Sequence, residues 1–214
     1  EGGDVTGQKP ESAAVWAKVT VTVKTVAHWL AATKRALSDA GQLRTLIDQF
    51  LRFGLEEELE DQIMSGDGSG ENFDGITHLS GTQSQAFSSN VPQTIRKAIT
   101  KVMHTGYVRP NAVGLNPADD EALDLLQDTT GRYFGSGPFG TGPSTIWGLP
   151  RVVSAAIPVG YAVVADWRQA VLWDREQATI SVSDSHEDFF TRNLVAVLGE
   201  ARAAFGILRP TAFC

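Results

Sequence analysis

The side chains that most often carry out chemistry are few in this sequence, and their spacing does not suit a catalytic or metal site. The 214 residues contain a single cysteine, Cys214, and four histidines, at positions 28, 78, 104 and 186. No histidine has a second His or Cys at metal-ligand spacing, and no Gly-x-Ser-x-Gly marks a nucleophile elbow. We expect no cofactor, no metal and no internal disulfide framework. We expect His28, which lies beside Trp29 in an apolar segment, to be a packed side chain.

Carboxylates are the one chemical group that clusters. Five acidic residues occupy six consecutive positions: Glu56, Glu57, Glu58, Glu60 and Asp61. Paired carboxylates can act as general acid and base. One hypothesis is therefore a soluble α/β enzyme that uses this acidic helix face, which requires a compact monomer with a deep pocket lined by these acids. The alternative is a solvated helix face.

A glycine-rich segment, Gly-Asp-Gly-Ser-Gly, follows at residues 66–70. A phosphate loop needs a preceding strand and a following Lys-Ser or Lys-Thr, and a calcium loop needs more oxygen ligands and a terminal Glu. The sequence provides neither pattern, so we predict a tight turn after a helix.

Two long elements come before this turn. Valines alternate with polar residues across residues 13–26, which predicts a strand. No complementary strand precedes it, so we expect its partner to come from deleted sequence or from another chain. Apolar residues then recur every three or four positions from Leu43 to Ile63. With Ser38 as N-cap and Gly66 as the stop, they predict a helix of about 25 residues, or roughly 37 Å.

The region after residue 80 alternates between helical and strand patterns, which is typical of an α/β arrangement. Helices are predicted at residues 91–104 and after Asn116-Pro117. Strands are predicted at 112–115, 161–165 and 178–182, and residues 131–143 form a surface loop. Periodicity alone does not separate a helix from a strand at 189–205, and its composition favours a strand.

Composition excludes several classes of protein. Hydrophobic residues make up 42% and charged residues 20%, which is too few charges for a disordered polyelectrolyte. The net charge is −7 and no basic block occurs, which argues against sequence-reading nucleic-acid binding. Segment 152–165 is shorter than the roughly 18 residues of a membrane-spanning helix. The chain starts with Glu1 and shows no signal peptide, so we expect a processed or truncated product.

The unpartnered strand and the long glycine-rich loop leave apolar surface and backbone edges that one compact chain covers poorly. Such surfaces usually contact other molecules. The residues alone therefore indicate a self-assembling subunit.

Eight short motifs resemble, in order, those of the major capsid proteins of tailed double-stranded-DNA bacteriophages with the Hong Kong 97 type fold. They lie at residues 9–12, 23–29, 67–70, 114–117, 131–133, 147–150, 173–175 and 209–212. The resemblance implies an α+β fold. Residues 1–25 would be the returning strand of an extended loop, and 26–83 a peripheral domain with a long spine helix. Residues 84–182 would be an α/β axial domain, and 183–214 the C-terminal strand segment of the peripheral domain.

The resemblance also implies a function. The chain would be a structural subunit, not an enzyme, that self-assembles into pentamers and hexamers around a double-stranded DNA genome bound non-specifically. Scaffolding and portal proteins would be partners, no membrane would be involved, and the capsid would assemble in the bacterial host cytoplasm. An encapsulin-type nanocompartment shell, which packages protein, is the alternative within the same fold.

One member of the family joins its subunits through isopeptide bonds, and the matching residues here are Lys9, Asn193 and Glu200. A lysine amine deprotonated by a carboxylate attacks a carboxamide, and ammonia leaves. If Asn193 and Glu200 share one strand, they lie about 23 Å apart on opposite faces, so several subunits would have to build the site. Glu176 replaces an apolar residue of that member, and we expect it to pair with Lys9 and keep the amine protonated.

Overall fold

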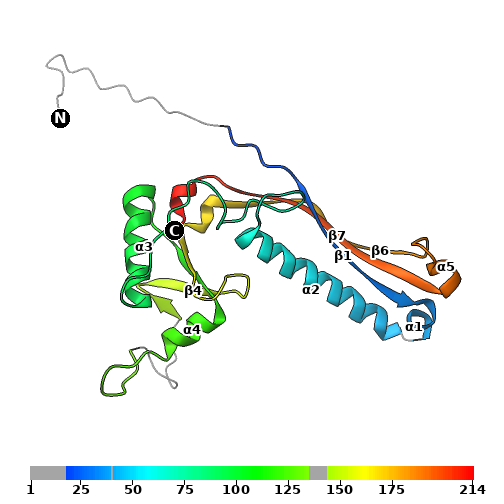
Figure 1. The fold of residues 1–214 in the computed structure, drawn as a ribbon, viewed down its shortest axis with the longest axis horizontal. Coiled ribbons are helices and arrows are strands. Elements are labelled where there is room, and N and C mark those ends of the chain that lie inside the picture. Colours follow the sequence, from blue (N-terminus) through cyan, green and yellow to red (C-terminus); the bar gives the residue numbers. More distant parts are fainter. Residues whose placement is uncertain (1–17, 40, 135–143) are drawn as a thin grey trace, which may run out of the picture.

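The computed structural model describes residues 18–39, 41–134 and 144–214. Figure 1 shows an elongated molecule with two parts. One part is a long sheet with the helix α2 alongside it, and the other is a shorter sheet with the helices α3 and α4. Their connections run back and forth, so both parts contain segments from distant regions of the sequence.

The long sheet has the order β1-β7-β6 and is antiparallel throughout. It contains β1 (Lys24–Thr33), β6 (Ala170–Ser183) and β7 (Leu194–Ile207). β7 is the central strand and pairs with β1 along all ten residues of β1. Val195 and Val197 of β7 are buried against Leu51 of α2, so α2 covers one face of this sheet.

Two helices follow β1. α1 (Lys34–Asp39) is short, and α2 (Gly41–Ser65) has 25 residues and ends one residue before Gly66. The predicted length and stop are confirmed. The prediction that Ser38 is the N-cap is wrong, because Ser38 lies inside α1. The turn after α2 is confirmed: Asp67 bridges to Asp74, and Gly68 and Gly70 adopt positive φ angles of 71° and 57°.

The shorter sheet has the order β3-β4-β2-β5. Its strands are β2 (Ala112–Leu115), β3 (Thr145–Ile146), β4 (Leu149–Val153) and β5 (Ala162–Ala165). β2 runs parallel to β4 and antiparallel to β5. α3 (Val91–Gly106) packs Ile95 and Ile99 against this sheet, and α4 (Pro117–Asp124) follows β2. The remaining helices are α5 (Phe189–Arg192), η1 (Trp167–Gln169) and η2 (Pro210–Ala212).

The structure corrects three predicted strands. Residues 18–23 of the segment predicted at 13–26 lie outside any strand, residues 13–17 lie outside the described range, and β1 continues instead to Thr33. The expected external partner of residues 24–26 is wrong, because β7 of the same chain pairs with them. The segment 178–182 belongs to β6 in the long sheet and not to the α/β part. The segment 189–205, favoured as a strand throughout, begins with the short helix α5, and the strand β7 starts only at Leu194.

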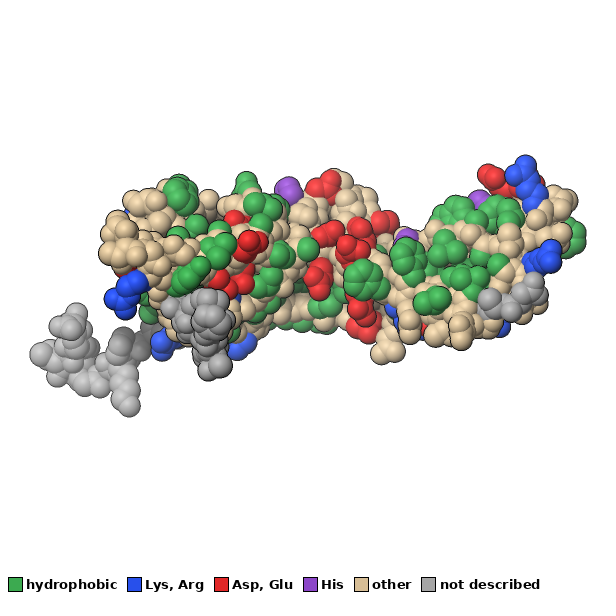
Figure 2. All heavy atoms as spheres, turned by 90° about the horizontal axis from the view of Figure 1, so that it is seen from below, with side chains coloured by type: hydrophobic (Ala, Val, Ile, Leu, Met, Phe, Trp, Pro, Cys, Tyr) green, Lys and Arg blue, Asp and Glu red, His purple; other side chains and the backbone are tan. Residues whose placement is uncertain are grey.

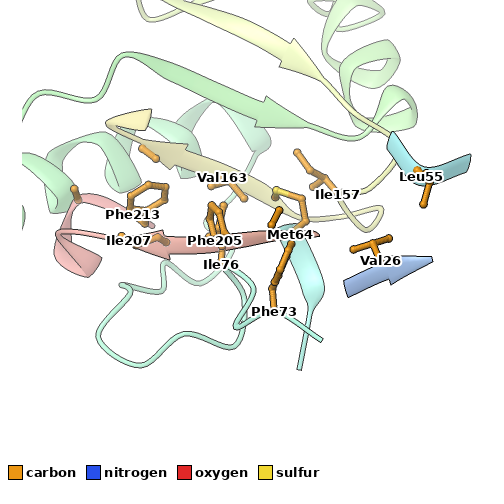
Figure 3. Packing of buried hydrophobic residues seen from close by; sticks show 13 residues of the cluster. Val26, Leu55, Met64, Phe73, Ile76, Ile157, Val163, Phe205, Ile207 and Phe213 are labelled. Atoms are coloured by element: carbon orange, nitrogen blue, oxygen red, sulfur yellow. The ribbon is translucent and has the colours of Figure 1, made fainter. Parts of the chain in front are cut away.

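A buried cluster joins the two parts of the molecule. Met64 of α2 and Phe73 of the turn after α2 pack with Val163 of β5, Phe205 of β7 and Phe213 near the C-terminus (Figure 3). These residues are each at most 6% exposed. Cys214 then exchanges backbone hydrogen bonds of 2.8 and 3.0 Å with Val164, which ties the end of the chain to β5.

His28 supports a testable prediction about α2. Its Nε2 lies 3.0 Å from the carbonyl oxygen of Leu51, and a Cβ added at Gly54 would lie 2.5 Å from His28 Cε1. Overpacking costs about 1–3 kcal/mol, which exceeds the roughly 1 kcal/mol that alanine gains over glycine in a helix. We expect Gly54→Ala to lower the free energy of unfolding, as measured by urea denaturation.

The matched control is Gly41→Ala, at the first residue of the same helix, where no side chain or distant backbone of the described residues lies within 4 Å of an added Cβ. This variant is expected to be neutral or slightly more stable. In a His28→Ala background, Gly54→Ala should become stabilising, because the clash is gone. Equal effects of Gly54→Ala with and without His28 would contradict the packing described.

Candidate assembly surface

In the described part of the chain, the face of the long sheet opposite α2 is contacted at its two ends, by Val21 on Gly206 and by His186 and Phe189 on Trp29. Trp29 pairs with Leu198 of β7, which in turn pairs with Ser181 of β6, so these three side chains share that face. Trp29 is 53% exposed and Leu198 is partly exposed. Glu200 and its partner Ala27 lie on the same face. An open sheet face with an exposed aromatic side chain is typical of a surface that contacts a partner.

The segment 18–23, which we call the ribbon, extends from the start of β1 away from the sheet (Figure 1). Val19 is 69% and Val23 is 37% exposed. Val21 behaves differently: a Cβ on Gly206 of β7 would lie 2.8 Å from Val21 Cγ2, so Val21 packs directly on that glycine. The ribbon therefore has an anchoring contact at Val21 and two exposed apolar side chains, Val19 and Val23.

The base of the ribbon is held by the turn that follows α2. Lys24 Nζ donates a hydrogen bond to the carbonyl oxygen of Gly70. The backbone N–H of Thr25 donates to the Glu71 carboxylate at 3.1 Å. Sequence analysis predicted the turn but not this role, because the contacts join residues 46 positions apart. The turn thus sets the direction in which the ribbon leaves the sheet.

Aromatic side chains gather at the far end of the long sheet. The His186 ring lies 5.1 Å from the ring of Trp29 and 5.0 Å from that of Phe189, both edge to face. Beside them, Lys34 forms a 2.7 Å ion pair with Asp184, and its hydrogen bond and charge lower the pKa of that carboxyl. Lys34 Nζ also lies 5.4 Å from the ring centroid of Phe190, which is 71% exposed. This tip is a second exposed apolar surface.

Of the three residues matched to the crosslinking member, the structure describes two, Asn193 and Glu200, and it places them apart. Asn193 ends α5 with a left-handed φ of 55° and is exposed, and its carbonyl oxygen accepts a 2.9 Å hydrogen bond from Lys34 N–H. The expectation that Asn193 lies on the strand is wrong, because β7 starts at Leu194. Glu200 lies six residues after Leu194 in β7, which is about 20 Å of extended chain. Lys9 lies outside the described residues.

Glu176 has a neighbour that sequence analysis missed. It lies opposite Arg202 in the β6–β7 ladder, and Arg202 Nη1 is 3.9 Å from Glu176 Oε2. Both side chains are about half exposed, so this is a loose surface ion pair. The expected pairing of Glu176 with Lys9 stays a prediction, and Arg202 would compete for the same carboxylate.

The structure does not favour an acidic enzyme site. All five clustered acids on α2 are exposed. A cavity of about 200 Å³ lies between β1 and α2, and Glu58 is the only one of the five among its lining residues. In the described residues, no group of three or more His, Cys, Asp or Glu side chains could hold a metal ion. His28, expected to be packed, also borders this cavity and contacts α2.

Each helix in the described residues is too short or too polar to span a membrane.

Comparison with solved structures identifies the fold. A chain from Gordonia phage Cozz has a TM-score of 0.73 and 15% identity, covering 96% of this chain and 77% of that one. The capsid chain of a native GTA particle has a TM-score of 0.64 and 15% identity, covering 91% of this chain and 72% of that one. The expected α+β fold of the Hong Kong 97 type is confirmed.

Sequence comparison identifies the family. The model of the phage capsid family matches residues 1–214. The major capsid protein of Enterobacteria phage HK97 is 36% identical over 208 residues, which are 95% of this chain and 54% of that protein. This chain belongs to the phage capsid family. It spans about half the length of that curated relative.

Two valines of the ribbon give a prediction about which of its side chains stabilises the fold. Val19→Ser replaces an exposed side chain, so we expect the free energy of unfolding to change by less than about 0.5 kcal/mol. Val21→Ser removes the contact with Gly206 and should cost more, on the order of 1 kcal/mol. Urea denaturation of both variants measures this. Equal losses of stability would contradict the described placement of the ribbon.

Proposed function

We propose that this chain is a structural subunit of a bacteriophage capsid that self-assembles into pentamers and hexamers around double-stranded DNA. Membership of the phage capsid family supports this proposal. The observation that carries it is the open surface: one face of the long sheet, the ribbon and the aromatic tip expose apolar side chains. In a shell, neighbouring copies cover such surfaces, and the same contacts are repeated by symmetry. The protein is then part of the virion.

The family assignment also bears on the parts of the subunit. We propose that the long sheet with α2 forms the peripheral domain and the shorter sheet with α3 and α4 the axial domain. The range proposed for the axial domain, 84–182, includes residues of β6 that hydrogen-bond to β7 in the long sheet. The ribbon is proposed as the end of the extended loop, whose range is 1–25.

The two other hypotheses have less support. The curated relative is a phage capsid protein, and this favours a viral shell over an encapsulin-type compartment. The enzyme hypothesis requires a deep pocket lined by the five acids, whereas the cavity beside α2 has one of them, Glu58, in its lining. Scaffolding and portal proteins remain proposed partners. For packaged DNA, a net charge of −7 supports weak, non-specific contact, because a strongly basic wall would hold a genome tightly.

Electron microscopy of the full-length protein tests the proposal. We expect closed shells with fivefold and sixfold clusters of subunits. Purified particles from infected cells should contain double-stranded DNA, whereas protein cargo would support the encapsulin hypothesis. A full-length protein that stays monomeric at all concentrations, by light scattering, would contradict both shell hypotheses.

Isopeptide crosslinking of assembled subunits is the finer proposal. Lys9 would attack the carboxamide of Asn193, Glu200 would accept the proton of the amine, and ammonia would leave as the new amide forms. Asn193 is exposed at the end of the sheet and Glu200 lies on the open sheet face, so both are accessible to a neighbouring chain. Their separation along β7 supports a site shared by several subunits, which would form only in a correctly assembled shell.

A denaturing gel of assembled shells tests this proposal. We expect a ladder of covalent oligomers, and loss of one ammonia per bond by mass spectrometry. Lys9→Ala should abolish the ladder, and so should Asn193→Gly, which suits the left-handed backbone but removes the carboxamide. Lys18→Ala is the control within the same loop and should keep the ladder. Monomer bands alone from intact wild-type shells would contradict crosslinking and leave the structural function untouched.

A further inference from the structure

The charges of this chain are unevenly distributed along its sequence. Residues 75–118 contain no Asp or Glu, although the whole chain has a net charge of −7. The same segment contains four basic residues, Arg96, Lys97, Lys101 and Arg109, and three of them belong to α3. α3 is therefore a basic helix in an acidic protein.

None of these three cations on α3 is paired with a carboxylate in the part of the chain that the structure describes. Arg96 donates to Thr100 Oγ1 at 3.0 Å, Lys97 donates to Ser88 Oγ, and Lys101 donates to the carbonyl oxygen of Ser84. Their hydrogen-bond partners are neutral, so their positive charge is uncompensated. The C-terminal end of α3 also exposes apolar side chains. Met103 is 47% exposed, and Tyr107, the residue after the helix, is 83% exposed. The helix thus combines unpaired cations with apolar area, as the rim and core of a protein interface do.

The complementary surface is the C-terminal half of α2. The five acids at 56–61 are exposed, and no ion pair between one of them and a described Lys or Arg is present. Glu58 and Glu60 bond instead to neutral partners, Gln62 and Ser154. Figure 2 shows acidic side chains gathered over the middle of the molecule in the view from below. We call the five acids of α2 at positions 56–61 the acidic segment.

The two charged surfaces lie in different places on the molecule. α3 lies at one end, beyond the shorter sheet, and α2 runs along the long sheet (Figure 1). One copy therefore cannot pair its own α3 with its own acidic segment. A ring of copies related by rotation can do so, because each head-to-tail contact joins one surface of a subunit to a different surface of the next.

We propose that α3 of one subunit docks on the acidic segment of α2 in the next subunit of the same ring. This inference rests on the proposed function, since it names the contact between neighbouring capsid subunits. Arg96, Lys97 and Lys101 meet carboxylates of the neighbour, and Met103 and Tyr107 supply apolar area beside them. Charge complementarity then orients subunits head to tail and disfavours face-to-face pairing of two like-charged surfaces.

A packaged nucleic acid is the other polyanion that a basic helix could meet. The second copy is favoured because the chain itself carries an equally unpaired acidic surface, which DNA would leave uncompensated. Docking between copies neutralises both surfaces, whereas DNA binding neutralises one. The two occupants also respond differently to charge reversal, which provides the test.

The experiment uses charge-swapped variants of the full-length protein and measures particle yield by sedimentation and electron microscopy. The basic variant is Arg96→Glu/Lys97→Glu, and the acidic variant is Glu57→Lys/Asp61→Lys. We expect each to lower the yield of particles by about tenfold or more, because like charges then face each other. The variant with all four changes restores the opposite charges and the original net charge, and its yield should return to within about twofold of wild type.

Arg44→Glu/Arg132→Glu is the matched control, because it changes the net charge as much as the basic variant but at exposed arginines outside the proposed assembly surfaces. It should assemble normally. Circular dichroism of the unassembled variants checks that each is folded. If the four-change variant stays as defective as the basic variant, or if the control loses assembly equally, the proposed contact is overturned. A basic variant that forms normal but DNA-poor particles overturns it in favour of nucleic acid as the occupant.

If the wild-type protein forms no particles, the proposed function fails. If wild type and all variants assemble equally well, only the α3–α2 contact fails.

Discussion

The arrangement of the molecule depends on the pairing of β7 with two strands from distant parts of the sequence. β1 pairs along one edge of β7 and β6 along the other, and α2 packs on only one face of the resulting sheet. A sheet covered on one face is stable when its other face is polar or covered by a partner. Here the open face contains Trp29 and Leu198, so this face is suited to contact with neighbouring copies.

Contact with neighbouring copies also accounts for the distribution of charge on the subunit. A flat, elongated subunit contacts its neighbours along its sides, and a ring requires these sides to be different and complementary. The basic α3 and the acidic segment of α2 satisfy this requirement, because neither has an oppositely charged partner among the described residues. The ribbon adds a contact that reaches further, and its direction is fixed by Lys24 and Thr25 at the turn after α2. Apolar area, charge and shape thus all support the same kind of assembly.

The sequence predicted the local elements well. Strand 112–115 has the predicted bounds, and α2 has the predicted length. The helix predicted at 91–104 continues for two more residues. These elements were predictable because caps, breakers and periodicity are local signals. The pairing of strands was not predictable. Residues 24–33 join residues 194–203, and no local pattern records contacts across such a separation. The split at Asn193 was missed for a related reason: its left-handed backbone ends a four-residue helix too short to show a period. The motifs indicated the family, but the contacts of Glu176 and Lys24 required the fold.

Hydrogen–deuterium exchange of the full-length protein, before and after assembly, tests most directly whether neighbouring copies cover the open surface. Exchange of amides in the ribbon, and of the β6 amides on the edge that does not pair with β7, should be fast in the unassembled subunit and should slow by at least about tenfold in particles. Protection of the ribbon that is already complete in the isolated subunit, or exchange in particles as fast as in the free chain, would contradict the account.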